Sequence, residues 1–305
     1  MIKRASVGQK QQGLRLDETL TQLFAEISRS EARRIIDRGG CSVNSAMARI
    51  ASRKACFGDA IEIGIMEKGR FKELILPPQA LLYEDDDLVA LDKPAGVNSQ
   101  RTPYQLRGTM EFWVSEYFRS EGVTEPARIV HRLDRGTSGA MVFPKHKRAA
   151  AWLSNAFHDG MIEKAYFAIV CGRPAEEAWV IDAPIGKIAS GRYGVVAGGK
   201  SAVTRFRLLF CCNGFSLVEA YPETGRTHQI RVHLEASGMP ILGDRVYGGA
   251  SASRMMLHCL SLTFASPDKR KVSILAPPPV EIISCLGGIE VSQLMQRAEF
   301  PAVFQ

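Results

Sequence analysis

Leucines recur every three or four residues near the start of the chain, at 16–23, and this spacing predicts a short amphipathic helix. A second short helix is indicated after Ser28, because Ser28 and Glu31 form a capping-box pattern and apolar residues follow on one side. Short apolar runs at 41–44 and 60–63 then predict two small strands. The first 65 residues therefore have the pattern of a small α/β module.

The second predicted helix has a basic side, and we expect it to end at Gly39. Arg29 and Arg33, and likewise Arg34 and Arg38, stand four residues apart and so lie on neighbouring rows of one short helix. Residues 1–65 hold eleven basic against seven acidic side chains, more than half of the net charge of +7 in about a fifth of the chain. This surplus favours an anionic partner. A solvated basic helix face accounts for the same pattern equally well.

Beyond residue 79 the pattern changes to apolar runs of strand length. Several of these runs are bounded by Gly or Pro, and they predict strands at 88–91, 140–143, 166–170, 204–209 and 217–221. Amphipathic helices are expected at 149–157 and 227–237. Many strands with few, irregularly placed helices predict an α+β domain built on a mixed or antiparallel sheet rather than a doubly wound fold.

The expected organisation has four parts. Pro77 and Pro78, after a charged, Gly-containing stretch, indicate a linker. We predict a module at 14–65, a linker at 66–79, a larger domain at 80–290 and a C-terminal tail at 291–305.

Composition excludes several classes of protein. The chain of 305 residues is 46% hydrophobic and 23% charged, as is ordinary for a globular protein. Its seven cysteines are odd in number and never spaced as C-x-x-C, so neither a disulfide framework nor a zinc site is indicated. The sequence shows neither an apolar stretch of signal-peptide length after Met1 nor a run long enough to span a membrane. We therefore expect a cytoplasmic protein with no membrane partner.

One aspartate stands out as a candidate for chemistry. Asp134 lies between Arg132 and Arg135 in a Gly-punctuated loop directly before a predicted strand, where catalytic and binding groups are commonly held. Neighbouring guanidinium groups favour the ionised form of such a carboxylate. From the residues alone, a catalytic carboxylate and a structural Arg/Asp turn cluster both remain open.

The run around Asp134 has a wider resemblance. Residues 131–139, His-Arg-Leu-Asp-Arg-Gly-Thr-Ser-Gly, resemble the signature of the RluA family of pseudouridine synthases at nine contiguous positions. Four further segments resemble the family's motifs in the family's order: 86–96, with Asp92 where Asn is usual, Lys164-Ala165-Tyr166, 225–234 and 257–260. The resemblance extends over roughly residues 14 to 275.

The N-terminal region resembles the RNA-binding module named after ribosomal protein S-four. The residues that carry this resemblance are Arg15-Leu16-Asp17, Ser28-Arg29-Ser30, Arg33 and Val43-Asn44. Ser45 departs from it, because the family usually has Gly there. The resemblance implies that the second helix, with Arg29, Arg33 and Arg34, contacts RNA.

The family resemblance implies an isomerase that converts uridine in RNA to pseudouridine without a cofactor. Asp134 is then the catalytic carboxylate, which attacks the sugar or the uracil ring or takes a ribose proton. Arg231 forms an ion pair with Asp134. Tyr166 stacks on the target uracil and lies close enough to assist proton removal, with a core aromatic as the alternative. Arg132 enters the RNA stack when the nucleotide is flipped out, with a surface salt bridge as the alternative.

The remaining basic and histidine side chains are assigned more simply. Lys93, Lys164 and Arg226 are expected to contact the RNA backbone. His131, His228 and His233 are expected to be structural, because no third ligand of suitable spacing accompanies them and no metal is predicted.

Two rival functions remain. A non-catalytic RNA-binding paralogue would predict a damaged centre, whereas Asp134, Tyr166 and Arg231 are all present. A glycosidase or nucleoside hydrolase would need a second carboxylate, and nothing in the sequence singles one out. By resemblance, the expected substrate is large-subunit ribosomal RNA, with transfer RNA second, and the expected state is a monomer.

Overall fold

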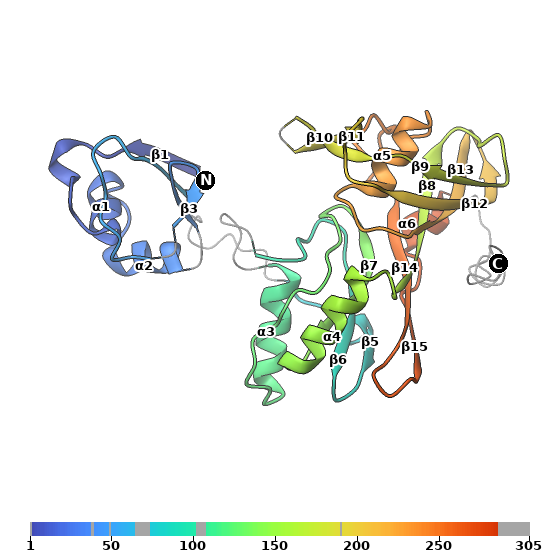
Figure 1. Cartoon of the computed structure of the whole chain (residues 1–305), viewed down its shortest axis with the longest axis horizontal. Coiled ribbons are helices and arrows are strands. Elements are labelled where there is room, and N and C mark those ends of the chain that lie inside the picture. The colour runs from blue at the N-terminus through green and yellow to red at the C-terminus, as the bar shows by residue number, and fades with distance from the viewer. Residues whose placement is uncertain are drawn as a thin grey trace. The chain divides into compact units, whose positions relative to one another are not determined.

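The computed structural model describes residues 2–37, 40–48, 50–64, 74–101, 108–189 and 191–285. The chain divides into two compact units, one comprising Met1–Ile75 and Gln100–Glu121 and the other Leu76–Ser99 and Gly122–Gln305 (Figure 1). Arg38 and Gly39, most of the expected linker and the whole expected tail lie outside the described residues.

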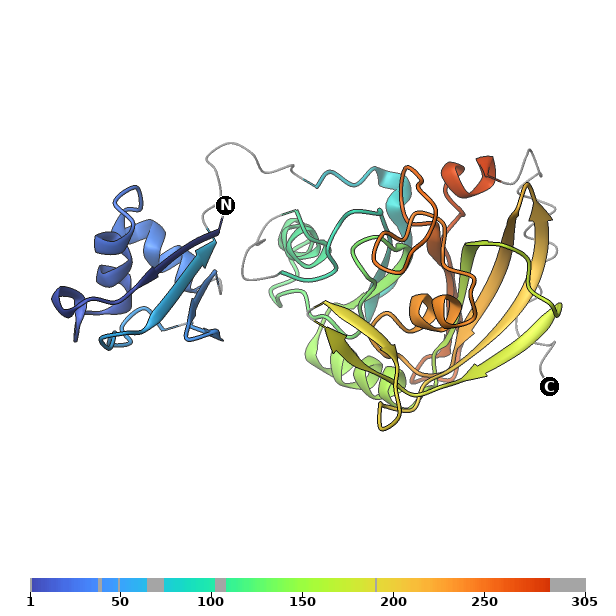
Figure 2. The same cartoon turned by 90° about the horizontal axis from the view of Figure 1, so that it is seen from above.

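The first unit contains a four-stranded sheet in the order β1-β4-β2-β3. Two helices pack on one side of this sheet (Figure 2). The elements of this part are β1 (Ile2–Ser6), a 3-10 turn (Gln9–Gln11), α1 (Leu16–Leu23), α2 (Arg29–Asp37), β2 (Cys41–Val43), β3 (Ala46–Met47) and β4 (Ala60–Gly64). The two helices and the strands at 41–44 and 60–63 are confirmed. Strand β1 was not predicted, so the small sheet begins well before residue 14.

Local chemistry explains where α2 begins. The backbone N–H of Glu31 donates to Ser28 Oγ at 3.3 Å, and the N–H of Ser28 donates back to Glu31 Oε2 at 3.0 Å. This is the reciprocal capping box that the sequence predicts. The buried side chains Leu16, Leu20 and Ile36 face a common core with the strands.

A further helix of the first unit was missed. α3 (Met110–Ser120) begins at Thr109, whose Oγ1 accepts a hydrogen bond from Phe112 N at 3.2 Å. Met110, Val114 and Phe118 are buried on one side of the helix. Their four-residue spacing and the Thr cap were readable in the sequence.

The second unit is built on a nine-stranded mixed sheet. Its order is β5-β6-β7-β14-β8-β13-β12-β9, with β15 paired to β14. Every pairing is antiparallel except β7 with β14, which is parallel. The strands are β5 (Leu81–Glu84), β6 (Leu88–Lys93), β7 (Ser138–Pro144), β8 (Glu163–Cys171), β9 (Ala178–Asp182), β12 (Val203–Cys212), β13 (Phe215–Pro222), β14 (Leu257–Ala265) and β15 (Lys271–Leu275). The predicted α+β class with a mixed sheet is confirmed.

Short helices and a hairpin complete this unit. They are a 3-10 turn (Pro78–Ala80), α4 (Lys147–His158), α5 (Gln229–Ala236), α6 (Val280–Ser284) and the hairpin of β10 (Ile185–Ala189) with β11 (Arg192–Val195). The five predicted strands and both predicted helices are confirmed. Strand β14 was missed because His258, Ser261 and Thr263 interrupt its apolar run, although all three are buried in the centre of the sheet.

One glycine fixes the junction between β7 and β14. Gly139 has a φ of +114°, and a Cβ there would lie 2.1 Å from the carbonyl oxygen of Cys259. Only glycine allows this close approach, which lets β14 run parallel beside β7. The loop that precedes β7, with Asp134, is thereby held against the middle of the sheet.

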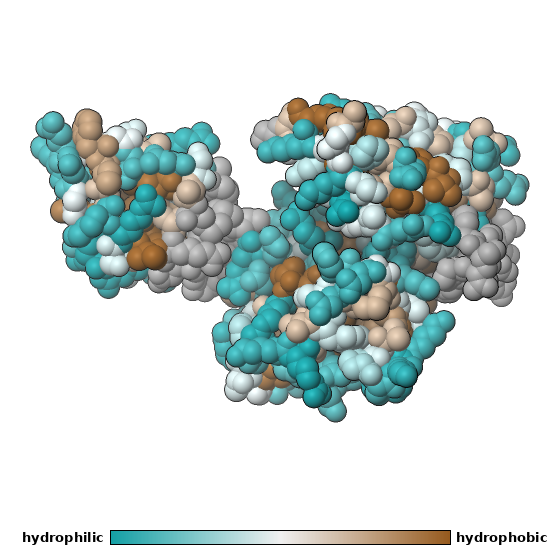
Figure 3. Space-filling view, in the orientation of Figure 1, coloured by the Kyte–Doolittle hydropathy of each residue, from teal (hydrophilic) through white to brown (hydrophobic). Residues whose placement is uncertain are grey.

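The visible surface is largely hydrophilic, with small separate apolar patches (Figure 3). Ile188 and Val195 of the β10–β11 hairpin contribute exposed apolar area. Within the described ranges, every helix is too short or too polar to cross a membrane.

Candidate active site

A cavity of about 660 Å³ in the second unit brings six of the predicted site residues together. They come from the loop before β7, from the start of β8 and from the loop and helix that follow β13. These residues are Arg132, Asp134, Lys164, Tyr166, Arg226 and Arg231.

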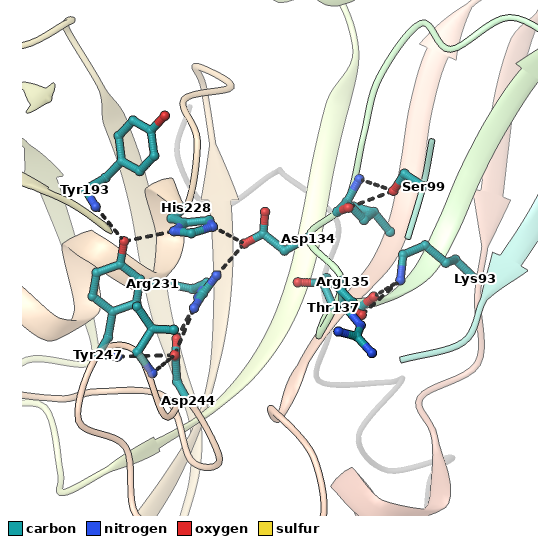
Figure 4. A network of polar contacts seen from close by, with 12 residues as sticks. Lys93, Ser99, Asp134, Arg135, Thr137, Tyr193, His228, Arg231, Asp244 and Tyr247 are labelled. Carbon is teal, nitrogen blue, oxygen red and sulfur yellow. Dashed lines mark hydrogen bonds and ion pairs between the residues drawn. The ribbon is translucent and has the colours of Figure 1, made fainter. Parts of the chain in front are cut away.

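The centre of the cavity is an ion pair between Asp134 and Arg231. Arg231 Nη1 donates to Asp134 Oδ2 at 2.9 Å, which is the pairing that the resemblance implies. The opposite side of the guanidinium binds Asp244, through Nε to Oδ2 at 2.6 Å and Nη2 to Oδ1 at 2.9 Å. The side chain of Arg231 is therefore fixed from two directions (Figure 4).

Asp134 keeps one oxygen uncommitted. Its Oδ2 faces Arg231 and His228, whereas the other oxygen points away from both (Figure 4). Within the described part of the chain, no donor lies at hydrogen-bond distance from Oδ1. The side chain of Asp134 is 18% exposed. A carboxylate oxygen directed into a cavity is available for chemistry.

Burial and neighbouring charges shift the pKa of Arg231 in opposite directions. Burial alone would lower its pKa, but the hydrogen bonds and charges of Asp244 and Asp134 outweigh burial and raise it. The Tyr247 ring also lies beneath the guanidinium, 4.8 Å from its carbon to the ring centroid. Arg231 is therefore a permanent cation beside Asp134.

Sequence reasoning missed three residues of this network. His228 was expected to be structural, yet its Nε2 lies 3.8 Å from Asp134 Oδ2 in the cavity. Its Nδ1 lies 2.9 Å from the hydroxyl of Tyr247. Asp244 and Tyr247 were not singled out, although they stand in the Gly-punctuated stretch 243–249, where a turn that holds polar groups is readable.

The loop that carries Asp134 is held from behind by residues that follow β6. Ser99 Oγ donates to the carbonyl of Leu133 at 2.7 Å and accepts from Leu133 N at 3.0 Å. Gly96 N donates to the Arg135 carbonyl at 2.7 Å, and Arg135 Nε donates to Gly96 O at 3.0 Å. These bonds fix the backbone on both sides of Asp134.

Lys93 corrects a prediction. We expected a contact with the RNA backbone, but the side chain is fully buried in the described structure. Its Nζ donates to the carbonyl of Thr137 at 2.6 Å (Figure 4) and to that of Pro94 at 3.0 Å. Burial lowers its pKa to about 7. Lys93 therefore supports the loop that carries Asp134 from within the protein.

Asp92, where Asn is usual in the family, does not disrupt this support. Burial raises the pKa of its carboxyl to about 6, against the opposing charges of Arg254 and Lys93 and a hydrogen bond from the backbone of Gly139. The bonds that join the loops around Gly96 and Arg135 are intact beside it.

Tyr166 lines the cavity and is 8% exposed. Burial raises the pKa of its hydroxyl well above the usual value, and Cys259 and Asp134 act in the same direction. The phenol is therefore neutral near pH 7. Burial also lowers the pKa of the neighbouring Lys164.

The other two histidines are held by contacts inside the protein. His131 Nε2 accepts from Val142 N at 3.0 Å, the ring stacks on Phe157, and burial lowers its pKa to about 3. His233 is buried between Thr204 and the carbonyl of Ala183. Among the described residues, no group of three His, Cys, Asp or Glu side chains is placed to hold a metal ion.

In the first unit, the predicted RNA-binding arginines surround a buried carboxylate. Asp17 accepts from Arg33 Nε at 2.7 Å and from Arg29 Nε at 3.3 Å. Arg15 Nε approaches its other oxygen at 3.0 Å. The side chain of Arg33 remains 51% exposed, so a guanidinium held by Asp17 still faces solvent. Arg34 lies on the exposed surface of α2.

The fold and the site define an enzyme class once they are compared with known proteins. The family model described as RNA pseudouridylate synthase matches residues 87–236, and the model of the S4 domain matches residues 14–61. The protein is an RNA-modifying isomerase that carries an RNA-binding domain. The chain belongs to the RNA pseudouridine synthase family, of the RluA type with an N-terminal S4 domain.

Individual relatives agree with this assignment. The chain is 34% identical over 294 residues to an uncharacterized RNA pseudouridine synthase of Mycobacterium bovis, covering 88% of this chain and 92% of that protein. It is 34% identical over 281 residues to ribosomal large subunit pseudouridine synthase D of Nitrosomonas europaea, covering 87% and 81%. The solved structure of human RNA pseudouridylate synthase domain containing 4 is similar, with a TM-score of 0.58, 25% identity and coverage of 68% and 93%.

Proposed function

We propose that this enzyme isomerises uridine in large-subunit ribosomal RNA, with Asp134 as its catalytic carboxylate. The observation that carries the assignment is the geometry of Asp134: Arg231 holds Oδ2 at 2.9 Å while Oδ1 points into the cavity. The fixed guanidinium stabilises a negative charge on Asp134, and the bonds of Ser99 and Gly96 hold the loop in place.

The isomerisation breaks the bond from uracil N1 to the ribose C1′ and forms a bond from uracil C5 to the same carbon. The proton leaves C5 and N1 gains one, so no cofactor is consumed. Asp134 serves either as a nucleophile toward C1′ or the uracil ring, or as a base toward the ribose. In each route Oδ1 is the reacting oxygen, because Oδ2 is bonded to Arg231.

Tyr166 and Arg132 have complementary parts in this proposal. Tyr166 supplies a ring surface on which a flipped uracil stacks. Its raised pKa disfavours the phenolate, so we assign it to stacking rather than to proton removal. Arg132 is exposed at the rim of the cavity, where it can occupy the space that a flipped nucleotide leaves in the RNA. Lys164 and Arg226 line the same cavity and are assigned to the RNA backbone.

The choice of ribosomal RNA is supported by the Nitrosomonas europaea relative, whose name refers to the ribosomal large subunit. Transfer RNA is the second candidate. We assign residues 14–65, together with strand β1 before them, to the RNA-binding module and 80–290 to the catalytic domain, in keeping with the two family matches. We further propose that the protein is a monomer. We place it in the cytoplasm, since all seven cysteines are free thiols, as is usual in a reducing compartment.

The test is to map pseudouridine in total RNA from cells with and without the gene, complemented by the wild type or by Asp134→Asn. We expect one or a few sites in large-subunit ribosomal RNA to disappear and to return only with the wild type. A map that does not change would contradict the proposal and favour the non-catalytic paralogue. Sites lost from transfer RNA alone would replace the proposed substrate while leaving the chemistry intact.

A further inference from the structure

His228 stands in an unusual backbone conformation directly before α5. Its φ of 59° and ψ of 20° lie in the left-handed region, which glycine and asparagine occupy more readily. Strained residues of this kind persist only where the surroundings hold them, and they gather at functional sites. The imidazole of His228 is therefore expected to have a role that glycine could not fill at this position.

The ring of His228 is held by two tyrosines. The rings of Tyr193 and Tyr247 lie edge-on to it, with centroids 5.6 and 5.7 Å away. The hydroxyl of Tyr247 accepts the backbone N–H of Tyr193 at 3.1 Å and lies 2.9 Å from His228 Nδ1 (Figure 4). The hydroxyl proton is thus available for Nδ1.

This contact bears on which nitrogen carries the proton. The Tyr247 oxygen already accepts the Tyr193 N–H, and with its hydroxyl donating to Nδ1 the neutral ring has its hydrogen on Nε2. Burial lowers the pKa of His228 and so favours the neutral ring, with Arg231 and Arg132 acting in the same direction and Asp134 and Asp244 in the opposite one. The N–H of Nε2 faces Asp134 Oδ2 at 3.8 Å.

We propose that His228 is a positioning residue, whose Nε2–H joins Arg231 on Oδ2 of Asp134 and so reserves Oδ1 for the substrate. The inference rests on the proposed catalytic role of Asp134. The present distance is longer than a hydrogen bond, and catalytic hydrogen bonds commonly shorten when the substrate is bound. Two donors on one oxygen fix the rotation of the carboxylate, whereas Arg231 alone leaves Oδ1 free to turn away from the uridine.

The same contacts link the carboxylate to the β10–β11 hairpin. Tyr193 lies on β11. Its backbone N–H binds the Tyr247 hydroxyl, which contacts His228, and His228 in turn faces Asp134. The hairpin therefore contributes to the orientation of the reacting group although His228 and Arg231, which face Asp134, lie outside it.

The experiment compares three variants with the wild type in single-turnover pseudouridine formation and in RNA binding. His228→Gly removes the donor and suits the left-handed backbone, so it should fold while the rate falls at least tenfold and the Kd for RNA stays within twofold. His228→Gln places an amide N–H near the position of Nε2 and should recover the rate to within about threefold of the wild type. Tyr247→Phe keeps the ring beneath Arg231 but loses the hydroxyl, and its rate should fall severalfold.

Two results would overturn the inference: a His228→Gly rate within twofold of the wild type, or a His228→Gln rate no better than that of His228→Gly. Should His228→Gly fail to fold, Tyr247→Phe decides, because a wild-type rate would contradict the role of the Tyr247 hydroxyl. Asp134→Asn is measured on the same RNA. If Asp134→Asn is as active as the wild type, the proposed function fails, whereas an inactive Asp134→Asn beside a fully active His228→Gly rejects this inference alone.

Discussion

Asp17 of the RNA-binding module and Asp134 of the catalytic domain are both held by arginine, but they differ in what remains available. Asp17 is fully buried and both of its oxygens accept from arginines. Asp134 is 18% exposed, and Arg231 binds just one of its oxygens. A carboxylate with both oxygens bound by arginines stabilises structure, whereas one with an oxygen left over in a cavity can react.

The difference extends to the arginines. Around Asp17, Arg29 and Arg33 stay about half exposed, so the carboxylate holds guanidinium groups that still face solvent. At the active site, Arg231 is buried, and its bond with Asp244 holds it in position beside Asp134. In the first case the aspartate orients arginines, and in the second the arginine orients an aspartate.

The largest effect after loss of Asp134 itself is expected at Asp244. Asp244→Asn removes the charge that fixes Arg231 from behind, and misplacement of a catalytic group by about 1 Å costs about 100-fold in rate. We expect the single-turnover rate to fall about 100-fold while RNA affinity stays within twofold. Asp268→Asn, which alters an exposed pair with Arg270, is the matched control. A rate for Asp244→Asn equal to that of the control would mean that Arg231 needs no support.

Asp17→Asn should instead act on stability. Breaking a fully buried ion pair costs about 3 to 5 kcal/mol. Because Arg15, Arg29 and Arg33 are about a third to a half exposed, we expect a smaller loss of about 2 kcal/mol for unfolding of the module. Denaturant unfolding of the full chain measures it, with the exposed Glu116→Gln as control. A loss of unfolding free energy no greater than that of the control would contradict a structural role of Asp17.

The stability that Asp17 contributes should depend on pH. Burial raises its pKa, but the hydrogen bonds of Arg15, Arg33 and Arg29 outweigh burial and hold the pKa well below its ordinary value. A lowered pKa in the folded state gives stability that is present above the unfolded value of about 3.9 and is lost as the pH falls below it. The difference in unfolding free energy between wild type and Asp17→Asn should therefore shrink below about pH 4. A difference that stays constant down to pH 2.5 would contradict the ion-pair account.

The smallest effect is expected on the exposed surface of α2. Arg34→Ala removes a cation that does not hold Asp17, so stability should not change while the dependence of RNA binding on salt weakens by about one unit of slope. Arg33→Ala should lower the slope similarly and also destabilise the module, because Arg33 holds Asp17. Titrations at several salt concentrations, with Arg119→Ala for comparison, measure both. An unchanged slope for both variants would mean that this helix surface is merely solvated.

Much of this fold is predictable because its signals are local. Leucine spacing and the Ser28 capping box identify α1 and α2, and continuous apolar runs identify five strands of the central sheet. Strand β14 is less readable, because its polar side chains are satisfied by partners far away in sequence, as in the bond between His258 Nδ1 and Ser138 Oγ.

In the active site, only the residues that belong to recognisable sequence motifs are predictable. The resemblance supplies Asp134, Tyr166 and Arg231, yet 97 residues separate the two partners of the ion pair. The turn that holds Asp244 and Tyr247 is readable from its glycines, but local spacing does not reveal the contacts of these residues with Arg231 and His228. Lys93 misled the prediction because lysine is seldom buried, and here backbone carbonyls satisfy it inside the protein.

The most direct test of the central claim is the single-turnover rate of pseudouridine formation by purified Asp134→Asn, measured with the RNA that the wild type modifies. The substitution keeps the shape of the side chain and removes its charge. We predict a fall of about 10⁴-fold or more, with RNA affinity within a few-fold and stability unchanged. A rate within tenfold of the wild type would contradict the assignment of Asp134 as the reacting carboxylate.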